Sequence, residues 1–172
     1  MKNLFIAALA AFCFSSCNDG AVSADNNDAR QKNIAANDVV IKAFETGDVS
    51  GIDSVIAPDF IDHTDMGDKK GPDSLKAMIS MVRNHFKDMK MEKVREVADD
   101  EYVFSWMRYS GTGDGTMGMP KGPYNMNSIE VSKFKDGKAV EHWAFVNAQE
   151  MMKMMGNSHD NMSHADTTTA KK

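Results

Sequence analysis

The chain has 172 residues, of which 42% are hydrophobic, and a formal net charge of −5 from 20 Lys and Arg against 25 Asp and Glu. The basic residues form no block that would follow a nucleic-acid backbone, so we expect no nucleic-acid partner. Once the polar ends are set aside, roughly 125 residues remain, which suits one domain and not two.

The N-terminal segment has the features of an export signal. Lys2 gives a positive start, and residues 4–14 form an apolar run that is long enough for a signal-peptide core and too short for a membrane span. The following Ser15-Ser16-Cys17 resembles the lipobox of bacterial lipoproteins, in which the cysteine is acylated. We therefore predict a lipoprotein signal peptide over 1–16 and a lipid anchor at Cys17. The alternative is plain secretion after cleavage near Ala24.

Both ends of the mature chain are expected to be flexible. Residues 17–28 are small, polar and acidic and therefore predict a tether, and the tail over 157–172 has the same character. Cys13 would leave with the signal peptide and Cys17 would carry lipid, so we expect no disulfide. The folded domain is predicted over 29–156.

Three helices are predicted in the first half of this domain. Apolar residues recur at helical spacing from Ala29 to Thr46, and Gly47 follows as a stop. A short second helix is indicated around Ile52–Ile56, before Pro58. Gly71-Pro72 then opens a third helix, because proline suits a first turn in which its missing N–H would be unpaired anyway.

After position 88 the hydrophobic period changes towards two, which is typical of strands. Strands are predicted over 91–97, 102–109, 124–134 and 138–147, with a short one around Phe60. Asp136-Gly137 predicts a hairpin, because both residues tolerate the positive φ of such turns. The glycine-rich stretch 111–122 predicts a long loop. Helices followed by an antiparallel sheet indicate an α+β fold with the helices on one face.

Four segments in order resemble one family of proteins. They are Ala43-Phe44-Glu45-Thr46-Gly47-Asp48, Pro58-Asp59-Phe60-Ile61-Asp62-His63, Gly118-Met119-Pro120 and Asp136-Gly137-Lys138-Ala139-Val140-Glu141-His142-Trp143. The chain resembles, over roughly 34–156, the SnoaL-like polyketide cyclase and ester cyclase family of the nuclear transport factor 2-like superfamily. This resemblance implies a cone in which a curved antiparallel sheet wraps around the three helices and encloses an apolar cavity.

The resemblance also implies a catalytic position that this chain does not fill. In the cyclases a pocket aspartate moves protons during an intramolecular aldol closure, and the matching position here is Ala144. Alanine cannot transfer a proton. Where many relatives carry Asp-x-x-Arg this chain reads Glu130-Val131-Ser132-Lys133, so Glu130 is the candidate replacement base.

Glu130, His142 and His63 are the candidate catalytic residues. His63 lies where many relatives contribute a pocket histidine, although a structural histidine is the alternative. A two-residue hairpin loop would set Glu130 opposite Trp143, whereas a three-residue loop with a glycine bulge would set it opposite His142. The resemblance favours the second arrangement. Glu130 and His142 would then form either an acid–base unit or a satisfied polar pair.

The remaining expectations concern the cavity wall. We expect Tyr102, Trp106, Met119, Met126 and Ala144 to contact a ligand. Most of the other aromatic residues on the strands are expected to pack in the core. An adaptable apolar wall is expected from several methionines, namely Met78, Met81, Met107, Met117, Met119 and Met126.

No cofactor or metal is predicted. The methionines over 151–155, with His159 and His164, have thioether and imidazole groups that suit Cu(I), but they lack a fixed repeat. A final amphipathic helix capped by Gly156 is favoured instead.

The leading functional hypothesis is a binding or carrier domain for a small apolar or weakly polar molecule at the cell envelope, attached to the membrane through the lipid anchor only. The alternative is an enzyme, either a cyclase, an isomerase or a hydrolase-like protein. A third hypothesis is a docking module that uses the open sheet face, for example in a homodimer.

Overall fold

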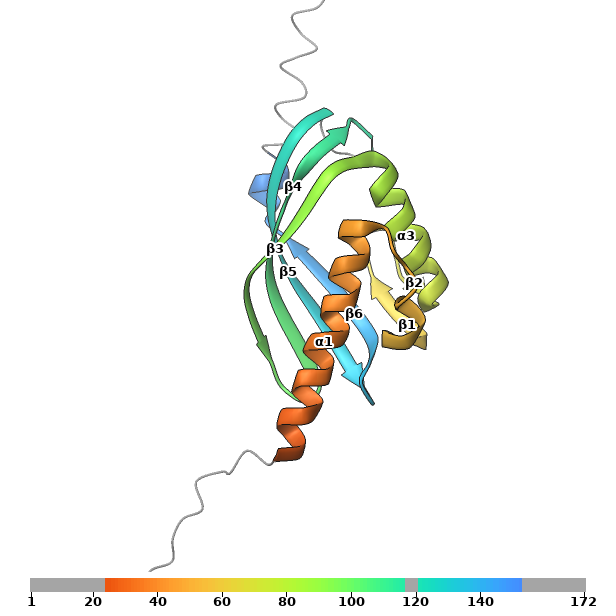
Figure 1. The fold of residues 1–172 in the computed structure, drawn as a ribbon. Coiled ribbons are helices and arrows are strands. Elements are labelled where there is room, and N and C mark those ends of the chain that lie inside the picture. The colour runs from red at the N-terminus through yellow and green to blue at the C-terminus, as the bar shows by residue number, and fades with distance from the viewer. Residues whose placement is uncertain (1–23, 117–120, 153–172) are drawn as a thin grey trace, which may run out of the picture.

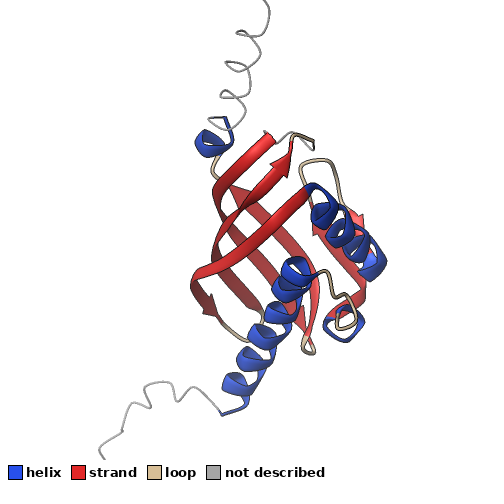
Figure 2. Ribbon diagram, turned by 45° about the horizontal axis from the view of Figure 1, so that its top comes forward, coloured by secondary structure: helices blue, strands red, loops and turns tan. Residues whose placement is uncertain are grey.

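Two long helices lie along one face of a strongly curved sheet (Figures 1 and 2). The protein is described by a computed structural model that covers residues 24–116 and 121–152. The helices are α1 (Ala24–Thr46), α2 (Ile52–Val55) and α3 (Gly71–His85). The predicted α+β class, with helices gathered on one face, is confirmed.

Helix α1 begins earlier than the sequence pattern indicated. It starts at Ala24, so residues 24–28, predicted as part of the tether, are helical. The tether prediction was therefore wrong at its C-terminal end, because polarity alone was taken as a sign of flexibility.

Helix α3 confirms the prediction made from Gly71-Pro72. Gly71 has a φ of 75°, a left-handed conformation that glycine adopts without steric cost, and the proline lies in the first turn. Leu75 and Ile79 are buried one turn apart, at 5% and 0% exposed, and pack on β1 and α1. This packing fixes α3 against β1 and α1.

The sheet has six strands in the order β2-β1-β6-β5-β4-β3. Their bounds are β1 (Ile56–His63), β2 (Lys69–Lys70), β3 (Phe86–Ala98), β4 (Tyr102–Asp114), β5 (Lys121–Lys135) and β6 (Lys138–Val146). The expected all-antiparallel sheet was wrong, because β1 pairs with β6 in parallel. That pair joins segments about 80 residues apart, and no local hairpin or turn signal reports such a contact.

The predicted long loop over 111–122 is strand at both of its ends. β4 continues to Asp114 and β5 starts at Lys121. Gly111 is needed for close strand approach rather than for a turn, since a Cβ there would lie 2.9 Å from the main-chain oxygen of Lys87 and 3.1 Å from Cα of Met89. Gly111 was therefore misread as a loop signal.

The β5–β6 hairpin has a two-residue turn followed by a bulge. Asp136 and Gly137 have φ values of 53° and 76°, and Lys135 pairs with Lys138. The pairing then shifts, since Phe134 faces Ala139 but Lys133 faces Glu141. The bulge rather than the turn type sets the register of everything beyond it.

The core lies between the helices and the sheet. Its buried members include Ile52, Ile56, Phe60, Ile79 and Val103, all at most 2% exposed. Some of these residues, Ile56 and Phe60 among them, also line a cavity between the same faces.

Candidate functional site

A cavity of about 430 Å³ lies between the inner face of the sheet and helices α1 and α3. Its wall is mostly apolar. The apolar lining side chains are Val40, Ile41, Phe44, Ile56, Phe60, Leu75, Met78, Val82, Phe86, Met89, Met91, Met107, Met126, Phe134, Ala139, Ala144 and Val146. The residues of α1 that the pattern assigned to the core therefore face this cavity in part, which explains why several are only half-buried.

Five methionines contribute to the wall, namely Met78, Met89, Met91, Met107 and Met126. Three of them are among the six predicted, whereas Met81 is 40% exposed and Met117 and Met119 lie outside the described residues. Methionine has three rotatable bonds and a polarizable sulfur, so such a wall adjusts to ligands of different shape.

One wall of the cavity carries a hydrogen-bonded chain of four side chains. The Nδ1 atom of His142 lies 2.8 Å from Oδ1 of Asp62, and its Nε2 atom lies 3.0 Å from Oε2 of Glu130. The hydroxyl of Tyr109 donates to Oε1 of Glu130 at 2.6 Å. The imidazole is thus held between two carboxylates, whose side chains are 8% and 15% exposed for Asp62 and Glu130.

Strand register explains why these residues meet. Asp62 on β1 pairs directly with His142 on β6, and Glu130 on β5 pairs with Ala144, two positions further along β6. Neither predicted hairpin register is correct, because the bulge adds a residue after a two-residue turn. The expectation that Glu130 and His142 share the cavity face with Ala144 is nevertheless confirmed.

The charge states of the cluster follow from burial and from these contacts. Burial opposes a charged imidazole, but the hydrogen bonds to Asp62 and Glu130 raise the pKa of His142 to about 9. Burial also opposes a charged Glu130, but the hydrogen bond and charge of His142 hold the Glu130 pKa below its ordinary value. Burial, reinforced by the Glu130 charge, raises the pKa of Tyr109 far above its ordinary value. At neutral pH His142 is therefore an imidazolium, Glu130 a carboxylate and Tyr109 a neutral phenol, and the Asp62 carboxylate lies on the other side of the imidazolium.

A second polar group reaches the cavity from α1. The Asn37 amide nitrogen donates to Oγ of Ser105 at 3.2 Å and to Oε2 of Glu96 at 3.4 Å. Ser105 donates to the same Glu96 oxygen at 3.0 Å, and Ser132 donates to Oδ1 of Asn37 at 3.3 Å. These bonds satisfy the buried polar groups that join the helix to the sheet.

His63 is among the residues that line the cavity, as the resemblance implied, but it does not join the hydrogen-bonded cluster. It lies at the cavity rim, next to Asp62, and successive side chains of a strand point to opposite faces. Its ring stacks on Trp143 with centroids 4.8 Å apart, and its nitrogens lie 3.0 Å and 3.1 Å from Asp68 and Glu141. The hydrogen bond that His63 donates to Glu141, opposed in part by desolvation, raises the pKa of His63. Asp62 takes the place expected for His63.

Tyr102 and Trp106, expected to contact a ligand, lie on the outer face of the sheet. Trp106 is 45% exposed, and the Tyr102 ring lies beside Phe104 with Lys133 Nζ 5.8 Å from its centroid. The expected packing of Phe104 and Phe145 in the core was also wrong, since they are 41% and 59% exposed. Met126 and Ala144 do line the cavity, whereas Met119 lies outside the described residues.

Two residues of the cluster were missed by sequence reasoning. Tyr109 was assigned to packing, and Asp62 was noted only as part of a motif. Asp62 could have been found from its place in a strand with several apolar residues. A carboxylate buried there needs a charged or hydrogen-bonding partner. For Tyr109 the signal was its position on the same alternation as Ser105 and Met107, which both face inward.

The described ranges contain no group of three or more His, Cys, Asp or Glu side chains that could hold a metal ion. Within those same ranges, no helix has the length and apolar character that crossing a membrane requires. The predicted lipid anchor, Cys17, and the His residues of the C-terminal tail lie outside the described residues.

The fold and site together define a cone-shaped α+β domain with an internal, mostly apolar cavity. Over residues 34–155 the chain matches the model of the SnoaL-like polyketide cyclase family, and it belongs to that family. No curated protein matches it significantly.

Solved structures support the fold at low sequence identity. TsrD from Streptomyces laurentii is 18% identical, with a TM-score of 0.65, and the match covers 74% of this chain and 96% of that one. A putative SnoaL-like polyketide cyclase from Jannaschia is 15% identical, with a TM-score of 0.64 and 74% and 93% coverage. An epoxide hydrolase from M. tuberculosis, described as LEH-like, is 12% identical, with a TM-score of 0.61 and 80% and 98% coverage.

Proposed function

We propose that this domain binds a small, mainly apolar molecule in its internal cavity and serves as a carrier or sensor rather than as a cyclase. The observation that carries the proposal is a mostly apolar cavity of about 430 Å³ in which the donors of Tyr109 and His142 are bound to carboxylates of the protein. Enclosed apolar cavities of this size, with few polar groups, are typical ligand sites.

The chemistry of the polar wall favours binding over aldol closure. A cyclase needs a base and a donor that stabilises the developing oxyanion. Here the lowered pKa makes Glu130 a weak base, and the donors of His142 and Tyr109 already bind carboxylates. Ala144, at the position of the family's catalytic aspartate, contributes no proton-transfer group.

Binding is tested with 2-methylnaphthalene, an uncharged fluorescent molecule that the cavity volume can hold. We expect saturable binding with one site per chain. Ala144→Phe should abolish it by filling the cavity beside Glu130, whereas Val97→Phe, at a position that is 58% exposed, should leave it unchanged. Both variants are checked by thermal melting. Binding that survives Ala144→Phe in a folded protein would place the ligand elsewhere.

An acid–base enzyme is the second candidate, because Glu130 faces the cavity with the His142–Asp62 pair behind it. Relatives of this fold include a putative polyketide cyclase and a protein described as an epoxide hydrolase. Incubation with small lactones, enones, ketones and epoxides tests this candidate. Conversion that Glu130→Gln abolishes would establish catalysis and displace the carrier proposal.

The location proposed for this function is the cell envelope, through a lipid on Cys17. Support comes from the charged start, the apolar run and the Ser-Ser-Cys ending of the sequence. Mass spectrometry of the mature protein is expected to find Cys17 at the N-terminus, with the added mass of lipid. An unmodified N-terminus well beyond position 17 would indicate plain export.

A further inference from the structure

The hydrogen-bond donors of the polar wall are already bound within the protein. The Tyr109 hydroxyl donates to Glu130, and protonated His142 donates from both nitrogens, to Asp62 and to Glu130. The Ser128 hydroxyl donates to a main-chain oxygen of β6 at 3.3 Å. A ligand carbonyl placed here would meet no unoccupied N–H or O–H from these four side chains.

The second polar group offers no donor either. Both hydrogens of the Asn37 amide are directed at Ser105 and Glu96, and the hydroxyls of Ser105 and Ser132 donate to Glu96 and Asn37. At the rim, Thr64 donates to the main-chain oxygen of residue 67 at 2.7 Å. The lining hydroxyls near the cluster therefore act only as acceptors towards a ligand.

Tyr124 is the exception, and it lies far from the cluster. The structure shows no hydrogen bond for its hydroxyl within the described residues. It is six positions from Glu130 along β5, which corresponds to ~20 Å of strand. Its ring packs edge-on against Phe86 at the other end of the cavity.

Acceptors, by contrast, remain open at the cluster. A carboxylate offers about four lone-pair directions. Glu130 receives two side-chain hydrogen bonds, one on each oxygen, and Asp62 receives one, from His142. Both carboxylates line the cavity, so a donor on a ligand finds several sites there.

The charge of the cavity wall also favours a hydrogen-bond donor on the ligand. The described residues that line the cavity include three acidic ones, Asp62, Asp65 and Glu130, but no Lys or Arg. His142 balances only one of the two carboxylates that flank it. The cluster therefore carries a net negative charge inside an apolar enclosure, where charge is poorly screened.

We infer that the cavity selects a ligand whose polar group is a cationic hydrogen-bond donor, namely a protonated amine on a compact apolar skeleton. This inference rests on the proposed binding function. Burying an ammonium group is costly unless it is paired and hydrogen-bonded, and Glu130 and Asp62 provide both. A carboxylate ligand would meet like charge and no open donor at the cluster.

The test compares three molecules with one skeleton, 1-naphthylmethylamine, 1-naphthalenemethanol and 1-naphthoic acid, with the full chain at pH 7 by titration calorimetry. We expect the amine to bind at least about tenfold more tightly than the alcohol, which corresponds to about 1.4 kcal/mol. The acid should show no saturable binding. Equal affinities, or an acid or alcohol that binds more tightly than the amine, would overturn the inference.

The possible outcomes distinguish a failure of the amine inference from a failure of the proposed binding function. If 2-methylnaphthalene and the alcohol bind but the amine gains nothing, the binding function stands and the amine class fails. If none of these molecules binds, the binding function itself fails and the inference with it. The ranking uses the unaltered protein, so it does not depend on a variant that folds.

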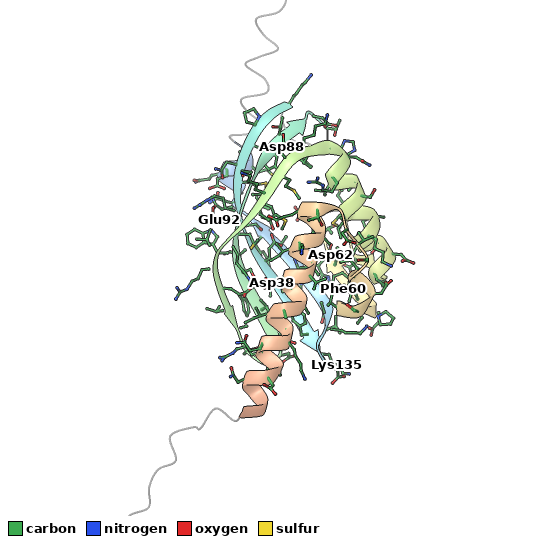
Figure 3. All side chains as sticks on the ribbon, in the orientation of Figure 1. Asp38, Phe60, Asp62, Asp88, Glu92 and Lys135 are labelled. Atoms are coloured by element: carbon green, nitrogen blue, oxygen red, sulfur yellow. The ribbon has the colours of Figure 1, made fainter. Side chains whose placement is uncertain are left out.

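A variant locates the preference at the cluster. Glu130→Gln keeps the shape of the side chain and removes its charge, so the amine should lose its tenfold advantage over the alcohol. The matched control is Glu92→Gln, since Glu92 lies on the side of the sheet away from the helices (Figure 3) and binds Arg108 there. An amine preference that survives Glu130→Gln in a folded protein overturns the assignment to this cluster.

Discussion

The imidazole of His142 lies between Asp62 and Glu130, and the pKa values of His142 and Glu130 are set by these contacts. We expect Glu130→Gln and His142→Gln each to lower the free energy of unfolding by about 1–3 kcal/mol. The first replaces the charged acceptor of His142 and Tyr109 with a neutral one, and the second removes the counter-ion of two buried carboxylates. The double variant should cost clearly less than the sum of the two. Urea denaturation measures all three, and additive losses would show that the two side chains act independently.

The same cluster predicts how stability depends on pH. The folded pKa of His142, about 9, lies above the ordinary 6.5, so its contribution is complete below pH 6.5 and is lost as pH rises through 9. The shift corresponds to about 3 kcal/mol. The lowered pKa of Glu130 has the opposite sign, so that contribution is present above pH 4.5 and lost at lower pH.

Unfolding free energies measured from pH 5 to 9.5 should therefore be highest near pH 5–6.5 and decline above it. His142→Gln should remove most of that decline. His63 also has a raised pKa, through Glu141 and Asp68, so His63→Gln serves as the control and should remove a smaller part. A decline that is unchanged in the His142 variant would assign the pH dependence to other groups.

At the scale of elements, the β3–β4 pair depends on a glycine. Gly111→Ala places a methyl group 2.9 Å from the Lys87 oxygen, on the backbone of a neighbouring strand that cannot move aside cheaply. We expect a loss of about 1–3 kcal/mol in urea denaturation. Ser110→Ala, on the same strand, should cost less than about 0.5 kcal/mol. A Gly111 variant as stable as the wild type would show that the strands separate there easily.

Helices and the hairpin turn could be predicted from the sequence because their signals are local. Gly71-Pro72 marks a helix start and Asp136-Gly137 a tight turn, whatever the rest of the chain does. The bulge on β6, just beyond the Phe134–Ala139 pair, has no such local signature. One extra residue there decides which side chains of β6 lie opposite Glu130.

The candidate site was predicted in part for the same reason. Glu130 and His142 lie on adjacent arms of one hairpin, so their proximity is a local matter. Asp62 is brought next to them by the parallel β1–β6 pair, which no local sequence pattern predicts. On β4 the usual rule is inverted, since Ser105 faces inward and Trp106 faces solvent, and alternation alone cannot reveal which face is which.

At the scale of the whole molecule, the outer face of the sheet is unusually apolar. Trp106, Ile129 and Phe145 form one cross-strand row and are 42–59% exposed. Contiguous exposed apolar surface is typical of interaction sites. The homodimer predicted from the sequence stays a prediction, and this row gives it a specific location.

We therefore expect the protein to sediment as a dimer and Trp106→Arg to sediment as a monomer. Because Trp106 contributes little to the core, the melting temperature of the variant at low protein concentration should stay within a few degrees of the wild type. Glu92→Gln, outside the row, should remain dimeric. A wild-type protein that sediments as a monomer at all concentrations would reject this interface.

The position of β6 has a consequence for how the chain acquires its structure. β6 lies between β1 and β5, so it alone connects the β2–β1 pair to the β5–β4–β3 meander. The meander contains only neighbouring antiparallel pairs and is able to form early, whereas β1 must wait for a partner that is synthesised some 80 residues later. Until β6 is in place, β1 and β5 each have an unpaired edge, and the cavity lacks the part of its wall that β6 supplies. β6 is the last of the described strands to be synthesised, so its insertion completes both the six-stranded sheet and the cavity wall.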